Sequence, residues 1–151
     1  MKISTRHDIA APPGEVFAAL SDFDRLERLL MESGAEVSRT DDRSHGPAGA
    51  TWTAKFTYRG RTRRAEASVV TFDLDQQIAM RTKIDGLVTI ANTELLPIGD
   101  SKTRMFAAID LRPTTFTSRL LVQSLKLGRG RLQKRLKKRL IQFGDHVEAS
   151  R

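Results

Sequence analysis

The chain has 151 residues, of which 39% are hydrophobic and 29% are charged. This composition is typical of a globular protein and excludes a disordered or membrane-spanning chain. No stretch approaches the ~20 consecutive apolar residues of a transmembrane helix. The N-terminus becomes polar at once and has no signal-peptide pattern. We therefore expect one cytoplasmic domain over residues 1–151.

The net charge of +8 is concentrated at the C-terminal end. Residues 112–151 hold 11 Lys and Arg against two acidic residues, whereas residues 1–111 are almost neutral. The chain has no cysteine, which excludes disulfides, a thiolate nucleophile and cysteine-based metal sites.

The first 34 residues predict one strand followed by two short helices. Residues 2–9 alternate apolar and polar side chains, which predicts a strand, and the Pro12-Pro13-Gly14 stretch ends it. Proline at a first helical position predicts a helix over residues 13–20, and a second helix is expected over residues 23–32. Gly34 ends this second helix.

A period of two then predicts six strands joined by short turns. The clearest strand has Trp52, Ala54, Phe56 and Tyr58 on one face, and Asp85-Gly86 is a strong hairpin turn. Such short connections favour an antiparallel meander. The predicted strands are residues 35–40, 51–58, 62–72, 78–84, 87–96 and 103–111.

The last segment, residues 114–150, predicts a long amphipathic helix. It contains no proline and carries an apolar stripe at spacings of three, four or seven residues. Gly128 and Gly130 fall inside it, where they are expected either to bend the helix or to allow a close approach. The stripe residues are Leu121, Leu125, Leu132, Leu136, Leu140, Phe143 and Val147.

These elements predict an α+β fold in which a seven-stranded curved antiparallel sheet wraps around a long C-terminal helix, with two short helices after the first strand. Inward-facing positions mix large residues with alanines, so we expect an apolar cavity between the sheet and the helix. The residues expected to bind a ligand there are Trp52, Phe56, Tyr58, Met80, Asn92, Met105, Leu121 and Leu125. The alternative for the apolar members is plain core, and Asn92 could equally lie on the outer face.

This order of elements, with the stretch IAAPPGEVFAALSD at residues 9–22, resembles the SRPBCC superfamily of START-like, helix-grip proteins. The resemblance covers the whole chain and is strongest to bacterial members called polyketide cyclase/dehydrase-like. It implies a deep apolar cavity used for lipids, sterols, hormones or polyketides, and in a minority of branches for catalysis. It carries no catalytic residue and no cofactor to this chain.

Catalysis has only weak support from the residues themselves. His7 and Glu94 are candidate acid–base groups, but each has an ordinary structural or surface alternative. No pair of histidines has the spacing of metal ligands, so no metal is expected.

The basic run of the last helix is the most unusual composition of the chain. It could bind an anionic membrane surface or an acidic partner, or it could simply be a solvated helix face. Stacking aromatics are absent from the run, so nucleic acid is not expected. The residues proposed for an anionic surface are Arg131, Lys134, Arg135, Lys137 and Lys138.

The sequence therefore favours non-enzymatic binding or carriage of a small hydrophobic ligand, such as a lipid, isoprenoid or polyketide-like molecule. Two alternatives remain: a cyclase- or aromatase-type enzyme, and an interaction module that uses the basic helix. The oligomeric state is not indicated.

Overall fold

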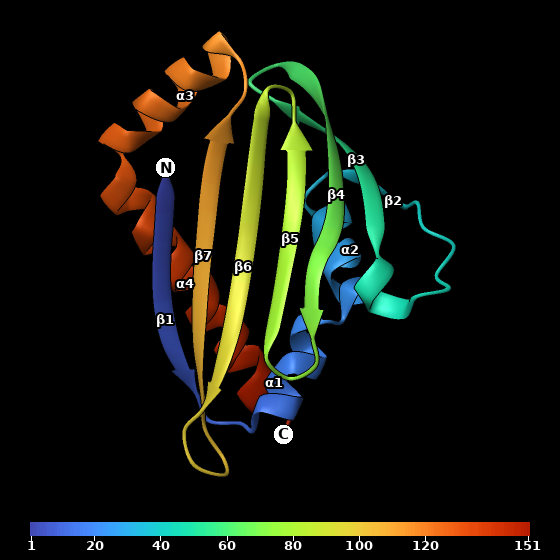
Figure 1. Ribbon diagram of the computed structural model, residues 1–151, viewed down its shortest axis with the longest axis vertical. Coiled ribbons are helices and arrows are strands. Elements are labelled where there is room, and N and C mark those ends of the chain that lie inside the picture. The colour runs from blue at the N-terminus through green and yellow to red at the C-terminus, as the bar shows by residue number, and fades with distance from the viewer.

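Seven strands form one antiparallel sheet in a computed structural model that describes residues 1–151. The strand order is β1-β7-β6-β5-β4-β3-β2, so β1 and β2 are the two edges. The sheet curves around the helices on one of its faces (Figure 1). The strands are β1 (Lys2–Ile9), β2 (Glu36–Arg39), β3 (Thr51–Tyr58), β4 (Arg61–Asp73), β5 (Gln77–Ile84), β6 (Leu87–Pro97) and β7 (Thr103–Pro113).

Four α-helices and one 3₁₀ turn complete the chain. The helices are α1 (Pro13–Leu20), α2 (Phe23–Glu32), α3 (Phe116–Leu127) and α4 (Arg129–Ala149), and the turn η1 spans Gly46–Gly49. Figure 1 views the sheet from the side away from the helices, with α4 running diagonally behind β1, β7 and β6 toward α1. The predicted helix-grip fold is confirmed, and the strands and first two helices begin and end within two residues of their predicted limits.

The C-terminal helix is not continuous, which corrects the expectation of one helix over residues 114–150. The backbone leaves helical geometry at Gly128, with φ −103° and ψ 20°, and the chain changes direction between α3 and α4. Glycine is ~1 kcal/mol less favourable than alanine in a helix interior. Little helix stability is therefore lost when the helix ends at Gly128. Gly130 remains helical. Only α4 therefore crosses the sheet, while α3 extends past its edge (Figure 1).

A close approach of α4 to β1 is made possible by Gly144. A Cβ atom at this position would lie 3.1 Å from Cδ2 of His7 and 3.2 Å from Cγ1 of Ile9. Helix and strand are thus in contact through a residue that has no side chain. The main core forms around this contact, between α1, α4 and the strands at that side of the sheet. Its buried members are Ile9, Ala11, Val16, Phe17, Ile78, Leu95, Met105, Ala107, Leu140 and Val147.

Part of the basic run of α4 protects the free edge of β1. Arg129 and Gln133 donate to the carbonyl oxygens of Lys2 and Ser4 at 2.7 and 2.9 Å. One turn further, Nζ of Lys137 donates to the carbonyl oxygen of Arg6. An uncovered edge strand offers such carbonyls to other chains, and covering them prevents edge-to-edge pairing. These three side chains therefore have a structural role.

Candidate functional site: an open apolar cavity

An apolar cavity lies between α2 and the strands β2 to β5, on the helix-bearing face of the sheet. Its volume is about 480 Å³, within the range of ~300–1,000 Å³ typical of small-molecule sites. The cavity is open to solvent, and 11 of its 15 lining residues are hydrophobic. The lining residues are Leu26, Glu27, Leu30, Ser33, Ala35, Val37, Trp52, Ala54, Phe56, Thr57, Ala65, Ala67, Met80, Thr82 and Ile84.

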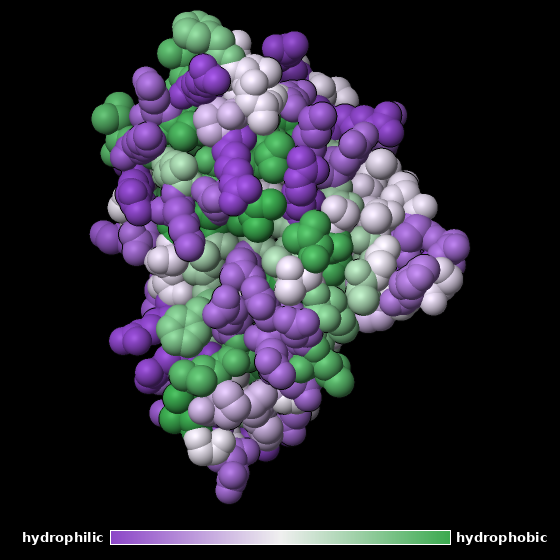
Figure 2. Space-filling view, in the orientation of Figure 1, coloured by the Kyte–Doolittle hydropathy of each residue, from purple (hydrophilic) through white to green (hydrophobic).

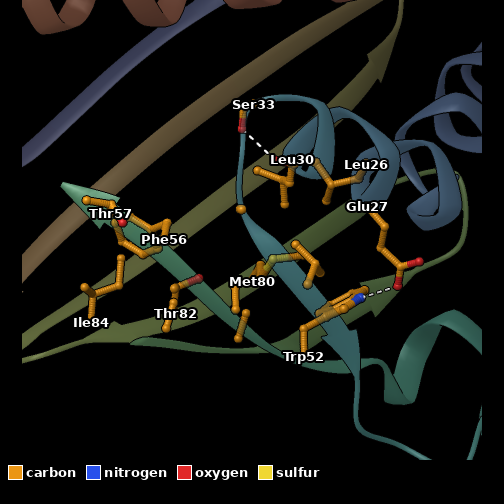
Figure 3. A pocket seen from close by; sticks show the side chains of 15 residues that line it. Leu26, Glu27, Leu30, Ser33, Trp52, Phe56, Thr57, Met80, Thr82 and Ile84 are labelled. Atoms are coloured by element: carbon orange, nitrogen blue, oxygen red, sulfur yellow. Dashed lines mark hydrogen bonds between the residues drawn. The ribbon is translucent and has the colours of Figure 1, made fainter. Parts of the chain in front are cut away.

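The cavity exists because its floor is built from small residues. Ala54 pairs with Ala65 across β3 and β4, and Ala67 pairs with Trp52 and Thr82 on either side. Alternate residues of a strand point to the same face, so these alanines lie together under α2. Leu26 and Leu30 of α2 reach toward this floor but do not fill the space above it (Figure 3).

Trp52 forms one end wall of the cavity and is held from three sides. Its Nε1 donates to Oε1 of Glu27 at 2.7 Å, and the ring of Phe23 packs edge-on at a centroid distance of 5.1 Å. The guanidinium of Arg39 lies 5.4 Å from the indole centroid. The side chain of Asp41 binds this guanidinium. The hydrogen bond with Arg39 lowers the pKa of Asp41, with smaller lowering by the backbone N–H groups of Thr51 and Arg43.

The polar groups of the cavity are few. Glu27 is the only ionisable lining residue, and its carboxylate accepts the indole hydrogen bond. Ser33 donates to the carbonyl oxygen of Leu30 at 2.7 Å. Thr57 and Thr82 add two hydroxyls to the lining. The geometry is suited to holding an apolar molecule with one or two polar atoms.

Three of the residues expected to bind a ligand line this cavity, namely Trp52, Phe56 and Met80. Figure 3 shows Trp52 and Phe56 at opposite ends and Met80 between them. Whether they bind a ligand stays a prediction. The cavity is bordered by α2 rather than by the C-terminal helix, which is the main difference from the expected site.

The other five expected ligand-binding residues lie elsewhere. Tyr58 is exposed as the last residue of β3, and Met105 is buried in the main core. Asn92 lies on the outer face, where its side chain accepts from Gln77 and donates to Glu94. Leu121 is exposed and Leu125 half-buried on α3, which turns away at Gly128. For Leu121 and Leu125, the periodicity of the sequence indicates an apolar helix face but does not show where the helix bends.

The candidate acid–base groups do not meet. His7 faces α4 at Gly144, within the covered part of the sheet, and Glu94 is exposed on the outer face beside Asn92. Neither lines the cavity. The structure therefore does not bring the two candidate acid–base groups together, and an acid–base role for either stays a prediction. No group of three or more His, Asp or Glu side chains is arranged to hold a metal ion.

The basic residues of α4 divide into two sets. Lys137 bonds to the edge of β1, whereas the side of α4 away from the sheet carries Arg131, Lys134, Arg135 and Lys138, all exposed. None of these four forms an ion pair. No helix of the protein combines the length and the apolar character required to cross a bilayer.

Sequence reasoning did not assign the α2 side of the cavity. The sequence predicts only a helix over residues 23–32, and no pattern in it singles out Leu26, Glu27 or Leu30. The available signal was that two leucines and a carboxylate on α2 lie opposite a strand face rich in alanine. Only the position of α2 over the sheet shows that these residues meet.

The fold is shared with solved structures of low sequence similarity. A protein of Thermus thermophilus is 19% identical, with 99% of each chain covered and a TM-score of 0.67. The Zhui aromatase/cyclase from a Streptomyces species is 12% identical, with 98% of this chain and 93% of that chain covered and a TM-score of 0.68. A START superfamily protein from Mycobacterium smegmatis is 14% identical, with 91% of this chain and 97% of that chain covered and a TM-score of 0.58.

No curated protein matches the sequence. A family model does, over residues 1–147, which is nearly the whole chain. The helix-grip fold, the cavity on the helix-bearing face and this match agree, and the chain belongs to the family described as polyketide cyclase / dehydrase and lipid transport.

Proposed function

We propose that the protein binds a small hydrophobic molecule in the cavity under α2 and carries or senses it without transforming it. The supporting observation is an open cavity of about 480 Å³ whose only ionisable group already binds the Trp52 indole. Burial of an apolar ligand there is favourable by roughly 25 cal/mol per Å² removed from water. The few hydroxyls serve to orient the ligand.

Two ligand classes suit the site and the family description, namely lipids and polyketide-like molecules. Most of the lining consists of aliphatic and aromatic side chains from four strands and one helix. A flexible acyl or isoprenoid chain can lie along the alanine floor between Trp52 and Phe56. A flat fused-ring molecule can stack on the same floor, and the titration below separates the two.

An enzymatic role receives less support from the geometry. General acid–base catalysis needs a positioned group within ~3 Å of the atom it protonates or deprotonates. The two acid–base candidates, His7 and Glu94, do not line the cavity, and the Tyr58 hydroxyl does not line it either.

The single tryptophan makes the proposal directly testable, because Trp52 lies in the cavity wall. The purified protein is titrated with cis-parinaric acid and with a hydroxyanthraquinone while the Trp52 emission is followed. We expect a saturable change with one ligand class at a stoichiometry of one. Native mass spectrometry then identifies any molecule that co-purifies.

A cavity-filling variant and a matched control decide where the ligand binds. Ala67→Leu adds volume to the cavity floor, whereas Val70→Leu adds one methylene group on the exposed side of the same strand. We expect at least a tenfold loss of affinity in Ala67→Leu and wild-type affinity in Val70→Leu. Equal binding by both variants, or no binding of either probe by the wild type, contradicts the proposal.

A further inference from the structure

Helix α3 buries one side against the sheet and exposes an apolar stripe on the other. Ser118 and Val122 are buried on the sheet side. At ~100° per residue, Phe116, Leu120 and Leu127 fall within about 40° of one another on the opposite side. Their exposed fractions are 74%, 53% and 93%. This exposed stripe makes no contribution to the core of the protein.

The chain segment that carries the stripe has charge of one sign, and Asp85 in the neighbouring β5–β6 turn is paired with Arg63. No acidic residue occurs between Leu111 and Gly144, a stretch that contains ten Lys and Arg residues. Arg119 and Lys126 of α3 lie on one flank of the stripe and form no ion pair. Figure 2 shows hydrophobic and hydrophilic side chains alternating along the margin of the molecule where α3 lies.

A second element brings the same chemistry to the same end of the sheet. The β3–β4 hairpin exposes Tyr58, with the guanidinium of Arg59 5.3 Å from its ring centroid, and Arg61 follows. Because neighbouring strands are antiparallel, β3, β5 and β7 all finish at this end of the sheet, and α3 begins there (Figure 1). We call this surface the docking end: Tyr58, Arg59, Arg61, Phe116, Arg119, Leu120, Lys126 and Leu127.

We propose that the docking end binds the surface of an anionic lipid bilayer. A bilayer interface accepts an exposed apolar stripe at the acyl boundary, places a tyrosine at headgroup level and pairs arginine and lysine with anionic headgroups. A second copy of this chain is disfavoured as the occupant, because two segments that carry only positive charge would then face each other.

Docking also brings one end of the cavity to the bilayer. The backbone N–H and Oγ1 of Thr114 both donate to the carbonyl oxygen of Gly86 at 2.8 Å, so the start of α3 is tied to the β5–β6 hairpin. Ile84, two residues before Gly86, lines the cavity at its Phe56 end (Figure 3). A hydrophobic ligand could then pass between the bilayer and the cavity. This consequence rests on the proposed function, but docking to the bilayer does not.

The test is sedimentation of the full chain with vesicles of phosphatidylcholine alone and of phosphatidylcholine mixed with phosphatidylglycerol. We expect binding to the anionic vesicles only, weakened by high salt. Each basic residue near an anionic surface strengthens partitioning by about fivefold, so Arg119→Glu with Lys126→Glu should weaken it by more than ~25-fold. The matched control is Arg28→Glu with Lys102→Glu, two exposed cations outside the docking end.

The apolar stripe has its own control at the opposite end of the sheet. Phe116→Ser with Leu127→Ser should weaken vesicle binding by at least tenfold. Leu74→Ser, at a leucine of the β4–β5 turn that is also largely exposed, at 70%, should leave it unchanged. All of these side chains are exposed, and thermal unfolding followed by circular dichroism checks that each variant is folded.

Several results would overturn the proposal: equal binding to neutral and anionic vesicles, equal binding by the stripe variant and its control, or a wild-type dimer that the stripe variant dissociates. The Ala67→Leu cavity variant separates docking from ligand binding. It should bind anionic vesicles as the wild type does. Ligand binding without vesicle binding refutes only docking, and vesicle binding without ligand binding refutes only the cavity proposal.

Discussion

The two halves of the helix-bearing face of the sheet are built differently. On the half formed by β1, β7, the adjoining part of β6 and the start of β5, α1 and α4 lie directly on the strands, and their side chains form one buried core. On the half formed by β3, β4 and β5, α2 lies above a floor of alanines and leaves an open cavity. The same face of one sheet thus carries a packed core on one half and an open cavity on the other half.

The difference comes from where the small residues are placed. On the packed half the small residue is on the helix, since Gly144 lets α4 approach His7 and Ile9. On the open half the small residues are on the strands, at Ala54 and Ala67, and α2 does not approach to compensate. Removing volume from a helix closes a gap, whereas removing it from a sheet beneath a fixed helix opens one.

Truncation of an aromatic residue should show this difference at its largest. Phe17→Ala removes a fully buried ring from the packed half and should destabilise the protein by about 3–5 kcal/mol. Phe56 is half-buried at the open cavity, so its truncation removes less buried apolar surface. Phe56→Ala should therefore cost only about 1 kcal/mol. Urea unfolding measures both free energies. Similar costs at the two sites would mean that the open half is packed in solution.

Enlargement of an alanine tests the same contrast in the opposite direction. Ala107→Leu places three extra carbons in the packed core and should destabilise the fold by about 1–3 kcal/mol. Ala67→Leu places them in the cavity and should change the free energy of unfolding by less than ~0.5 kcal/mol. Urea unfolding again provides the comparison. A large penalty at Ala67 would show that the cavity has no room for a leucine.

The parts of this arrangement that depend on residues close together in the sequence could be predicted from it. Alternation within β3 and the Asp85-Gly86 turn are local features, so the strands and the antiparallel order were predictable. The helices over residues 13–20 and 23–32 have local start and stop signals and were also predicted correctly.

The position of the cavity depends on contacts that local patterns do not contain. Gly128 and Gly130 look alike in the sequence, yet only Gly128 ends a helix. The bend removes Leu121 and Leu125 from the sheet, so the expected roof of the cavity is absent. Met105 and Met80 have the same alternation on their strands, but α4 covers the first and leaves the second open.

The glycine at the bend gives the next prediction. A Cβ at Gly128 would meet nothing closer than the carbonyl oxygen of Leu125 at 3.8 Å, and its φ of −103° is allowed for any residue. Gly128→Ala should therefore stabilise the protein by about 0.5–1 kcal/mol through loss of unfolded-chain entropy. Gly144→Ala should give no such gain, because Ile9 is fully buried and cannot yield. Thermal unfolding distinguishes the two, and a gain at Gly144 would show that α4 is loosely seated.

The smallest expected effect is a dependence on acid, and it too distinguishes the halves. Arg39 lowers the pKa of Asp41 beside the cavity wall, and Arg104 lowers the pKa of Asp8 on the packed half, through a side-chain hydrogen bond in each case. Both carboxyls have an unperturbed value of 3.8. A carboxyl whose pKa is lower when folded contributes stability that is complete above the unfolded value and is lost as the pH falls through the folded one.

Asp41→Asn and Asp8→Asn should therefore both reduce the loss of stability as the pH falls below the unperturbed value of 3.8. Urea unfolding at a series of acidic pH values measures this loss. Only Asp41→Asn should also change the Trp52 emission near neutral pH, because Asp41 holds the Arg39 guanidinium over the indole. An identical emission spectrum in both variants would mean that the ion pair does not position the cavity wall. In that case the rigidity of Trp52 would depend on Glu27 and Phe23 alone.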